Sequence, residues 1–83
     1  MFYVYLIRSE NKGLYIGYTT DLKNRIEGHN SGNTVTTRGH QWELIYYEAY
    51  KSEKDARNRE LALKRSGGGR RHLKERLVNS LNE

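Results

Sequence analysis

Residues 2–30 read F-Y-V-Y-L-I-R-S-E-N-K-G-L-Y-I-G-Y-T-T-D-L-K-N-R-I-E-G-H-N, and this stretch decides the fold. Two short runs, residues 2–7 and 14–18, are rich in the aromatic and β-branched side chains that are typical of strands. Between them, residues 11–13 have turn composition, and Gly13 is free to adopt a positive φ. The stretch therefore predicts a β-hairpin.

A helical pattern follows the hairpin directly. Thr19 or Thr20 is expected to cap the N-terminus of this helix, and Asp21 suits the positive end of the helix dipole. Gly32 stands just beyond the pattern and is expected to end the helix.

Four polar side chains are expected to converge on this frame. If the hairpin pairs odd residues with odd residues without a bulge, Tyr5 and Tyr15 project from the same side. Arg25 and His29 are four residues apart and therefore neighbours on a helix. These residue types are also ordinary, because Tyr is a common strand residue and Arg25 could simply pair with Asp21. The pattern alone leaves both interpretations open.

The order of the motifs resembles the GIY-YIG nuclease family. Y-V-Y at residues 3–5, Y-I-G at residues 15–17 and then Arg25 match a first motif ending in Tyr, a second motif Tyr-Ile/Val-Gly and a helical Arg. Tyr3 stands where the name-giving Gly would be, and small stand-alone members commonly lack that Gly. His29 falls where other members carry Tyr or His.

Length and composition limit the class of protein. Eighty-three residues predict one small domain spanning residues 1–83. The chain has no Cys, so we expect neither disulfides nor a thiolate metal site. No apolar run approaches the ~18 residues of a membrane span, and no signal-peptide pattern opens the chain. We therefore expect a cytoplasmic protein that does not bind membranes.

The charge is asymmetric along the chain. Residues 1–50 carry five Lys or Arg and five Asp or Glu, whereas residues 51–83 carry ten and five, and so hold the whole net charge of +5. Such asymmetry favours an anionic partner, usually nucleic acid. A solvated helical face would show the same composition, so composition does not decide between the two.

Residues 31–39 have loop composition. Thr37 and Arg38 could donate hydrogen bonds to phosphate oxygens, or belong to an ordinary surface loop. Related small members of the family carry a Thr-Arg-Gly here. The resemblance therefore implies that the loop borders the active site.

Residues 42–50 predict a third strand, with Trp42, Leu44 and Tyr46 on one face and Ile45 and Tyr47 on the other. Nothing in this strand demands chemistry, and Trp42 is expected to belong to the core.

Ser52 is expected to cap the next helix. On it, Glu60 interrupts an apolar stripe that contains Ala56 and Leu63. A buried carboxylate needs a positive partner, which would be Arg57, Lys64, Arg25 or a metal ion. The resemblance implies the metal, because the family's metal ligand is a Glu on this helix.

Residues 66–69 are expected to end this helix and to form a flexible joint. A last helix is then expected to begin at Arg70. The apolar side chains that should dock it on the sheet are Leu73, Leu77, Val78 and Leu81. The expected fold is thus α+β, a small three-stranded antiparallel sheet flanked by helices in the order β-β-α-β-α-α, as in GIY-YIG domains.

The resemblance assigns chemical roles for phosphodiester cleavage. Tyr5 would act as general base, assisted by Tyr15, and Arg25 would neutralise the phosphate. Arg25 and a cation nearby are expected to favour the phenolate, since a phenol with an ordinary pKa near 10 is a poor base. Glu60 would hold one divalent cation, Mg²⁺ or Mn²⁺, and His29 would contact the phosphate or relay a proton.

The expected partner is DNA, with RNA as an open alternative, and a targeting protein could be an additional partner. The residues expected to contact nucleic acid are Gly17, Thr37, Arg38, Lys64, Arg70 and Arg71. The expected activity is that of a metal-dependent endonuclease for branched, nicked or single-stranded DNA in repair or recombination. Two alternatives stay open, a non-catalytic nucleic-acid-binding module of the same fold and a protein whose basic helices bind an acidic partner.

Overall fold

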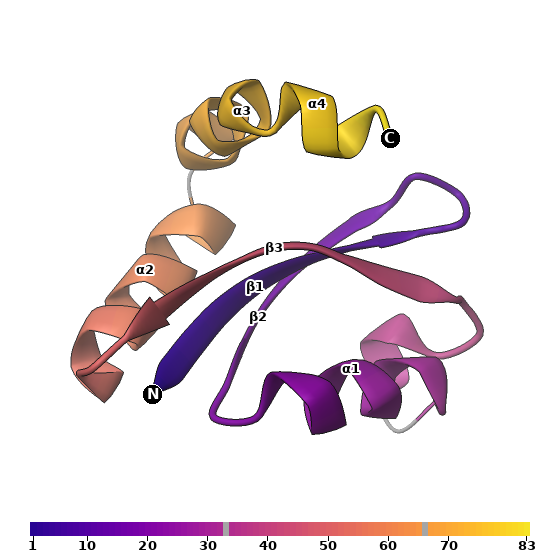
Figure 1. Cartoon of the computed structure of the whole chain (residues 1–83), viewed down its shortest axis with the longest axis horizontal. Helices are drawn as coiled ribbons and strands as arrows, with labels where there is room; N and C mark the ends of the chain where they lie inside the picture. Colours follow the sequence, from indigo (N-terminus) through magenta and orange to yellow (C-terminus); the bar gives the residue numbers. More distant parts are fainter. Residues whose placement is uncertain (33, 66) are drawn as a thin grey trace.

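The computed structural model describes residues 1–32, 34–65 and 67–83. The elements are β1 (Phe2–Ser9), β2 (Leu14–Thr19), α1 (Leu22–Asn30), a 3₁₀ turn (Val35–Thr37), β3 (Trp42–Tyr50), α2 (Glu53–Arg65), α3 (Gly67–Arg76) and α4 (Val78–Leu81). This confirms the predicted α+β class and the order β-β-α-β-α-α, with the last helical segment broken at Leu77 into α3 and α4. Figure 1 shows α1 on one side of the sheet, and α3 with α4 on the other.

The sheet is antiparallel with strand order β2-β1-β3, so β1 is central. Tyr5 pairs with Gly17 and Ile7 pairs with Tyr15, so odd residues do pair with odd residues in the hairpin. Tyr5 and Tyr15 consequently share a face. The turn differs from the prediction, because Lys12 rather than Gly13 adopts the positive φ, at 70°.

A bulge changes the faces of β3. Leu6 pairs with Tyr46 but Ile7 pairs with Leu44, so the register shifts at Ile45. The prediction that Leu44 and Tyr46 share a face is therefore wrong, because one extra residue reverses the alternation.

The hydrophobic core lies between the sheet and the helices α2 and α3. Its fully buried members are Val4, Leu6, Ile16, Ala56, Leu63 and Leu73. Val4, Leu6 and Ile16 come from β1 and β2, and the other three belong to the apolar stripes that the sequence predicted for the two helices. Val78 was expected to join them, but it is 53% exposed because α3 ends at Arg76 and α4 begins a new direction.

Helix ends differ from the prediction in two places. Asp21, not Thr19 or Thr20, caps α1, and its Oδ1 accepts a hydrogen bond from the Asn24 backbone N–H at 3.2 Å. Gly32 follows the helix with φ +80° and donates its N–H to the His29 carbonyl, as expected.

The expected glycine joint is the second difference. Residue 66 lies outside the described residues, and Gly67–Gly69 form the first turn of α3. The helix therefore begins three residues earlier than the predicted start at Arg70.

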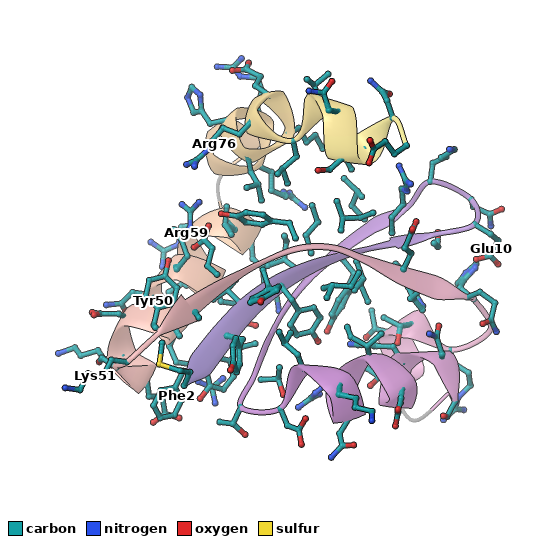
Figure 2. All side chains as sticks on the ribbon, viewed as in Figure 1. Phe2, Glu10, Tyr50, Lys51, Arg59 and Arg76 are labelled. Carbon is teal, nitrogen blue, oxygen red and sulfur yellow. The ribbon has the colours of Figure 1, made fainter. Side chains whose placement is uncertain are left out.

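A carboxylate clamp holds α2 against β3. Glu48 of β3 accepts hydrogen bonds from Arg59 Nε at 2.9 Å and Arg59 Nη2 at 3.0 Å. The hydroxyls of Tyr46 and Tyr50 donate to the same carboxylate, and Figure 2 shows Tyr50 beside Arg59. The clamp fixes the position of α2 and therefore of Glu60, which directly follows Arg59.

Candidate active site

A buried chain of three polar side chains lies between β1 and α1. The Tyr5 hydroxyl is 2.7 Å from His29 Nε2, and His29 Nδ1 is 2.7 Å from the Thr37 hydroxyl. Tyr5 is 2% exposed, and His29 and Thr37 are fully buried. His29 is the one buried residue that α1 contributes, so the helix presents its imidazole to the sheet.

The direction of these hydrogen bonds follows from their partners. Thr37 Oγ1 donates to the Thr34 carbonyl at 3.4 Å and is then free to accept from His29 Nδ1–H. The other ring nitrogen, Nε2, is thereby left as an acceptor for the Tyr5 O–H. Trp42 Nε1–H donates to the Thr37 carbonyl at 2.9 Å and fixes the loop. The arrangement assigns a neutral His29 that can receive a proton from Tyr5.

Burial sets the pKa of both members of this pair. Desolvation raises the pKa of Tyr5, and Tyr15 and Glu60 raise it further, whereas Arg25 lowers it. Desolvation, with the positive charge of Arg25, lowers the pKa of His29. Arg25 thus lowers the pKa of Tyr5 in the expected direction, but burial outweighs the guanidinium, so Arg25 alone does not produce a phenolate.

Tyr15 and Gly17 complete the wall of the site on β2. The Tyr15 ring meets the His29 ring edge-on, at 5.1 Å between centroids, and the Trp42 ring at 6.2 Å. Gly17 lies directly opposite Tyr5, and a Cβ at this position would overlap the Tyr5 hydroxyl and ring. The glycine is required because the Tyr5 ring occupies the space of its side chain.

Arg25 lies at the open side of the site. Its side chain is exposed and, within the part of the chain that the structure describes, forms no ion pair. It lines a groove of about 350 Å³ with Thr19, Asp21, Asn24, Gly28 and Thr34. The alternative pairing with Asp21 is absent among the described residues, because that carboxylate caps the helix and accepts from the Asn24 side chain.

Glu60 reaches the site from α2. Its side chain is 17% exposed and accepts from Lys64 Nζ at 3.0 Å, with Arg57 Nη1 at 3.9 Å. Lys64 Nζ also lies 5.6 Å from the centre of the Tyr15 ring. Although the core of α2 packs on the opposite face of the sheet, these contacts bring Glu60 to the edge of β2 beside the tyrosines. The predicted positive partner is thus present.

The carboxylate fits one kind of metal site. Across residues 1–32, 34–65 and 67–83, no three His, Cys, Asp or Glu side chains form a metal-binding cluster. Mg²⁺ often takes only one or two carboxylates and completes its octahedron with waters and substrate phosphates. Glu60 fits such a site as a single protein ligand once its ion pairs with Lys64 and Arg57 are broken.

Gly17 and Lys64 lie at the site as described above, and the other four residues expected to contact nucleic acid fall into three groups. Thr37 contradicts the expectation, because its hydroxyl is fully buried and bound to His29. Arg38 is exposed, but its Nε donates to the Gly32 carbonyl at 3.0 Å. Arg70 and Arg71 are exposed and line a separate pocket with Leu14 and Lys74.

The sequence carries a signal for the position of Lys74 but none for the role of Thr37. Nothing in the sequence signals that Thr37 orients His29, since the two residues are eight apart and no expected helix or strand spacing relates them. Lys74, in contrast, follows Arg70 by four residues, and this helical spacing was available as a signal.

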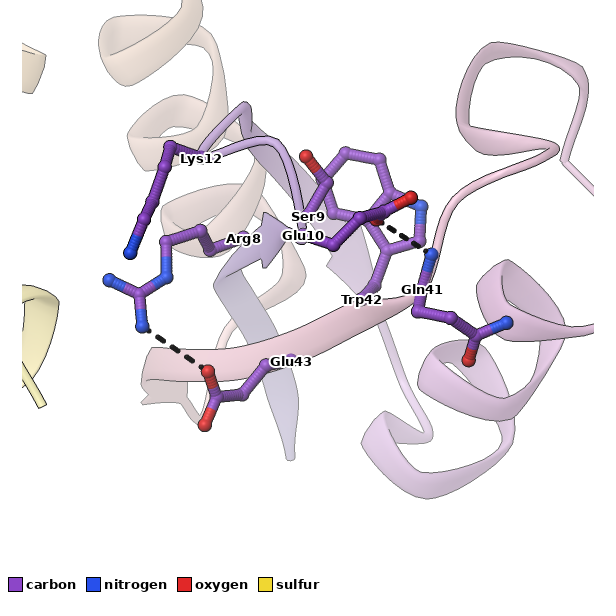
Figure 3. A pocket seen from close by; sticks show the side chains of 7 residues that line it. All are labelled: Arg8, Ser9, Glu10, Lys12, Gln41, Trp42 and Glu43. Carbon is purple, nitrogen blue, oxygen red and sulfur yellow. Dashed lines mark hydrogen bonds and ion pairs between the residues drawn. The ribbon is translucent and has the colours of Figure 1, made fainter.

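A further pocket, beside the turn between β1 and β2, has a structural role. Figure 3 shows Arg8, Lys12 and Glu43 in it, with an ion pair of 3.3 Å between Arg8 and Glu43. The Arg8 guanidinium also donates to the carbonyls of Leu81 and Glu83 and so fastens the C-terminal segment to β1.

No helix within the described ranges is both long enough and apolar enough to cross a membrane.

Comparisons with known proteins identify similar sequences and one similar fold. The family model described as "GIY-YIG catalytic domain" matches residues 1–75. A UPF0213 protein of Clostridium perfringens is 36% identical over 67 residues, which cover 78% of this chain and 72% of the relative. A UPF0213 protein of Streptococcus pyogenes is 37% identical over 65 residues, covering 76% and 71%.

A solved structure is also similar. The solution NMR structure of a UPF0213 protein from Bacillus halodurans superposes with a TM-score of 0.56 at 35% sequence identity, covering 95% of this chain and 84% of that one. Because the family model spans most of the sequence and the relatives exceed 30% identity over most of their length, the chain belongs to the GIY-YIG nuclease family.

Proposed function

We propose that this protein is a metal-dependent endonuclease that hydrolyses phosphodiester bonds in DNA. The observation that carries the proposal is the Tyr5–His29 hydrogen bond of 2.7 Å, which lies between β1 and α1 beside Tyr15, with Arg25 and Glu60 near enough to shift the pKa of Tyr5. Candidate substrates are branched, nicked or single-stranded DNA, and the biological setting would be repair or recombination in the cytoplasm.

The first step would be activation of the attacking water. Tyr5 keeps its proton at neutral pH because its pKa is raised, so it does not act as a standing phenolate. Instead, its hydroxyl would accept a proton from water as it donates its own to His29 Nε2. The lowered pKa of His29 keeps the imidazole neutral and ready to accept. The pair would therefore move one proton from water into the protein interior.

Charge on the phosphate would be neutralised from both sides of the groove. Arg25 has no acidic partner among the residues described, so its guanidinium is available for charge-assisted hydrogen bonds to phosphate oxygens. Tyr15 would donate its hydroxyl to the same phosphate. Glu60 would hold Mg²⁺ or Mn²⁺, which supplies Lewis-acid stabilisation of the departing oxygen when bound. Lys64, once released from Glu60, would be free to bind a neighbouring phosphate.

The test is cleavage by the full chain of labelled single-stranded, nicked and branched DNA, each with Mg²⁺, Mn²⁺ or EDTA. We expect cutting with either metal and none in EDTA. Glu60→Gln should reduce the rate at least about 100-fold, as expected for loss of a metal ligand. Glu75→Gln, at an exposed glutamate of α3, is the matched control and should cut like the wild type. Absence of any metal-dependent cut on all three substrates would contradict the proposal.

One observation favours a second candidate, a nucleic-acid-binding module of the same fold without turnover. Glu60 is paired with both Lys64 and Arg57, and this double pairing opposes metal binding. Salt-sensitive binding of DNA or RNA with no cut under any metal condition would support this alternative. A targeting protein would be sought only if neither binding nor cutting is found with the isolated chain.

A further inference from the structure

We infer that Arg70, Arg71 and Lys74 of α3 form, with Leu14 of β2, a second phosphate-binding subsite for the same nucleic-acid strand. These four residues line one pocket of about 380 Å³ at the start of α3. Three cations thus face one open cavity with a single apolar side chain. The inference rests on the proposed function, in that the strand is the one that enters the site at Tyr5.

The three cations of this pocket are uncommitted. All three side chains are exposed, and none forms an ion pair within the described ranges. Arg59 and Lys64 of α2 differ in this respect, since Arg59 binds Glu48 and Lys64 binds Glu60. Like charges held together without a counter-ion repel one another, so an anion in the pocket would relieve the repulsion.

The pocket and the candidate active site lie on opposite faces of the same edge strand. Leu14 immediately precedes Tyr15 on β2, but its side chain packs against the core on the side of α2 and α3, whereas Tyr15 contacts His29 of α1. Lys64, which lies 5.6 Å from the Tyr15 ring, belongs to the last turn of α2, and α3 begins at Gly67. Lys64 therefore lies between the site and the pocket, and a strand that enters the site would reach the pocket by passing around the edge at β2.

The chemistry of the pocket selects a sugar–phosphate backbone. Guanidinium groups bind phosphate oxygens bidentately, and Lys74 adds a point charge. Contacts to phosphate fix the position of a strand and carry no sequence information, so we expect the subsite to position the strand mainly through its backbone.

The experiment measures binding without cutting. The full-length Glu60→Gln variant is titrated with a labelled single-stranded oligonucleotide at several salt concentrations. In this background, R70A/R71A/K74A removes the pocket, and K23A/K51A/R76A removes the same charge elsewhere. Lys23 lines a groove with Leu44 of β3, Lys51 follows β3, and the charge of Arg76 acts on Tyr46 of β3. Figure 2 shows Lys51 and Arg76 at the surface of the molecule.

We expect the pocket variant to bind at least about tenfold more weakly at low salt. The slope of log affinity against log salt should fall by about 2, since each phosphate contact to a single strand contributes about 0.7. The control variant should lose less than half as much in both quantities. Equal losses in the two variants would overturn the subsite, because binding would then follow net charge alone. Circular dichroism checks that α3 stays folded, as expected for alanine at exposed helical positions.

The two proposals fail separately. If the wild type cuts DNA but the two triple variants bind alike, the subsite is wrong and the nuclease proposal stands. If the wild type does not cut any substrate but the pocket variant alone loses binding, the subsite stands and the nuclease proposal is wrong.

Discussion

The two faces of β1 are held by opposite kinds of interaction. Val4 and Leu6 point to α2 and α3 and are buried among apolar side chains. Tyr5, between them, points to α1 and is buried in a hydrogen-bonded chain with His29 and Thr37. Apolar packing is non-directional, whereas a buried donor or acceptor needs one partner in one place. One face therefore supplies stability, and the other supplies chemistry.

The buried polar side chains on the Tyr5 face all form hydrogen bonds. No buried side-chain nitrogen or oxygen among the described residues lacks a hydrogen-bond partner. Removal of one member of the chain leaves its neighbour unpaired, so the cost is set by geometry rather than by buried area. This difference between the faces can be tested by substitutions on each.

The largest effect is expected for Tyr5→Phe. The ring and its packing remain, but the water loses its path to His29, so cleavage should fall about 10²- to 10⁴-fold. The free energy of unfolding should fall by only about 1–3 kcal/mol, because one buried nitrogen loses its partner. Single-turnover cleavage and urea denaturation measure the two quantities. Tyr3→Phe, on the same face and packed edge-on against Tyr47, is the control and should cut normally.

On the apolar face, Leu63→Ala should lower the free energy of unfolding by about 2–5 kcal/mol, because a fully buried side chain leaves a cavity. Urea denaturation measures the change. Leu61→Ala, on the same helix but 51% exposed, should change it by no more than about 0.5 kcal/mol. Equal losses in the two variants would contradict the position of the core.

Gly17→Ala is expected to affect both stability and cleavage. The added methyl group overlaps the Tyr5 hydroxyl, and the buried Tyr5 ring has to move. Overpacking of this kind costs about 1–3 kcal/mol, and cleavage should fall as the Tyr5–His29 distance changes. Gly13→Ala, whose methyl group would meet only Ser9 Oγ at 3.1 Å, is the milder control. Wild-type cleavage by the Gly17 variant would contradict the contact.

Thr37→Val tests the orientation of His29 with almost no change of volume. The imidazole loses its acceptor at Nδ1 and can move its proton to Nε2, which limits the stability cost to about 1 kcal/mol. In that tautomer Nε2 no longer accepts from Tyr5, so cleavage should fall while the fold persists. Ring ¹⁵N chemical shifts report the tautomer. Thr36→Val, at an exposed neighbour, should leave it unchanged.

The smallest effect is expected from a change in pH, acting on the free energy of unfolding through His29. Burial lowers the pKa of His29 below its ordinary value near 6.5, so the unfolded chain binds more protons than the folded chain in this range. Stability is therefore full above about pH 6.5 and decreases as the pH falls toward the folded pKa, by at most about 1.4 kcal/mol per pH unit. Denaturation curves and an NMR titration of the His29 ring between pH 5 and 7.5 measure this. A His29 pKa at or above 6.5 would contradict the burial argument.

The sequence alone determined the hairpin, the order of the elements, the apolar stripes and the residue types of the site. These depend on local propensity, alternation and spacing, which neighbouring residues fix by themselves. The prediction that Tyr5 and Tyr15 share a face depended on odd-to-odd pairing in the hairpin, which the observed register confirms.

Only the tertiary structure decided which electrostatic effect dominates in the site. Arg25 and burial act in opposite directions on the pKa of Tyr5, and their balance depends on how α1 covers β1. The commitment of Thr37 to His29 and the bulge at Ile45 likewise depend on contacts between segments far apart in the chain. Residue types and spacing set the chemistry that is available, but three-dimensional packing sets the dielectric environment and the partners of each group.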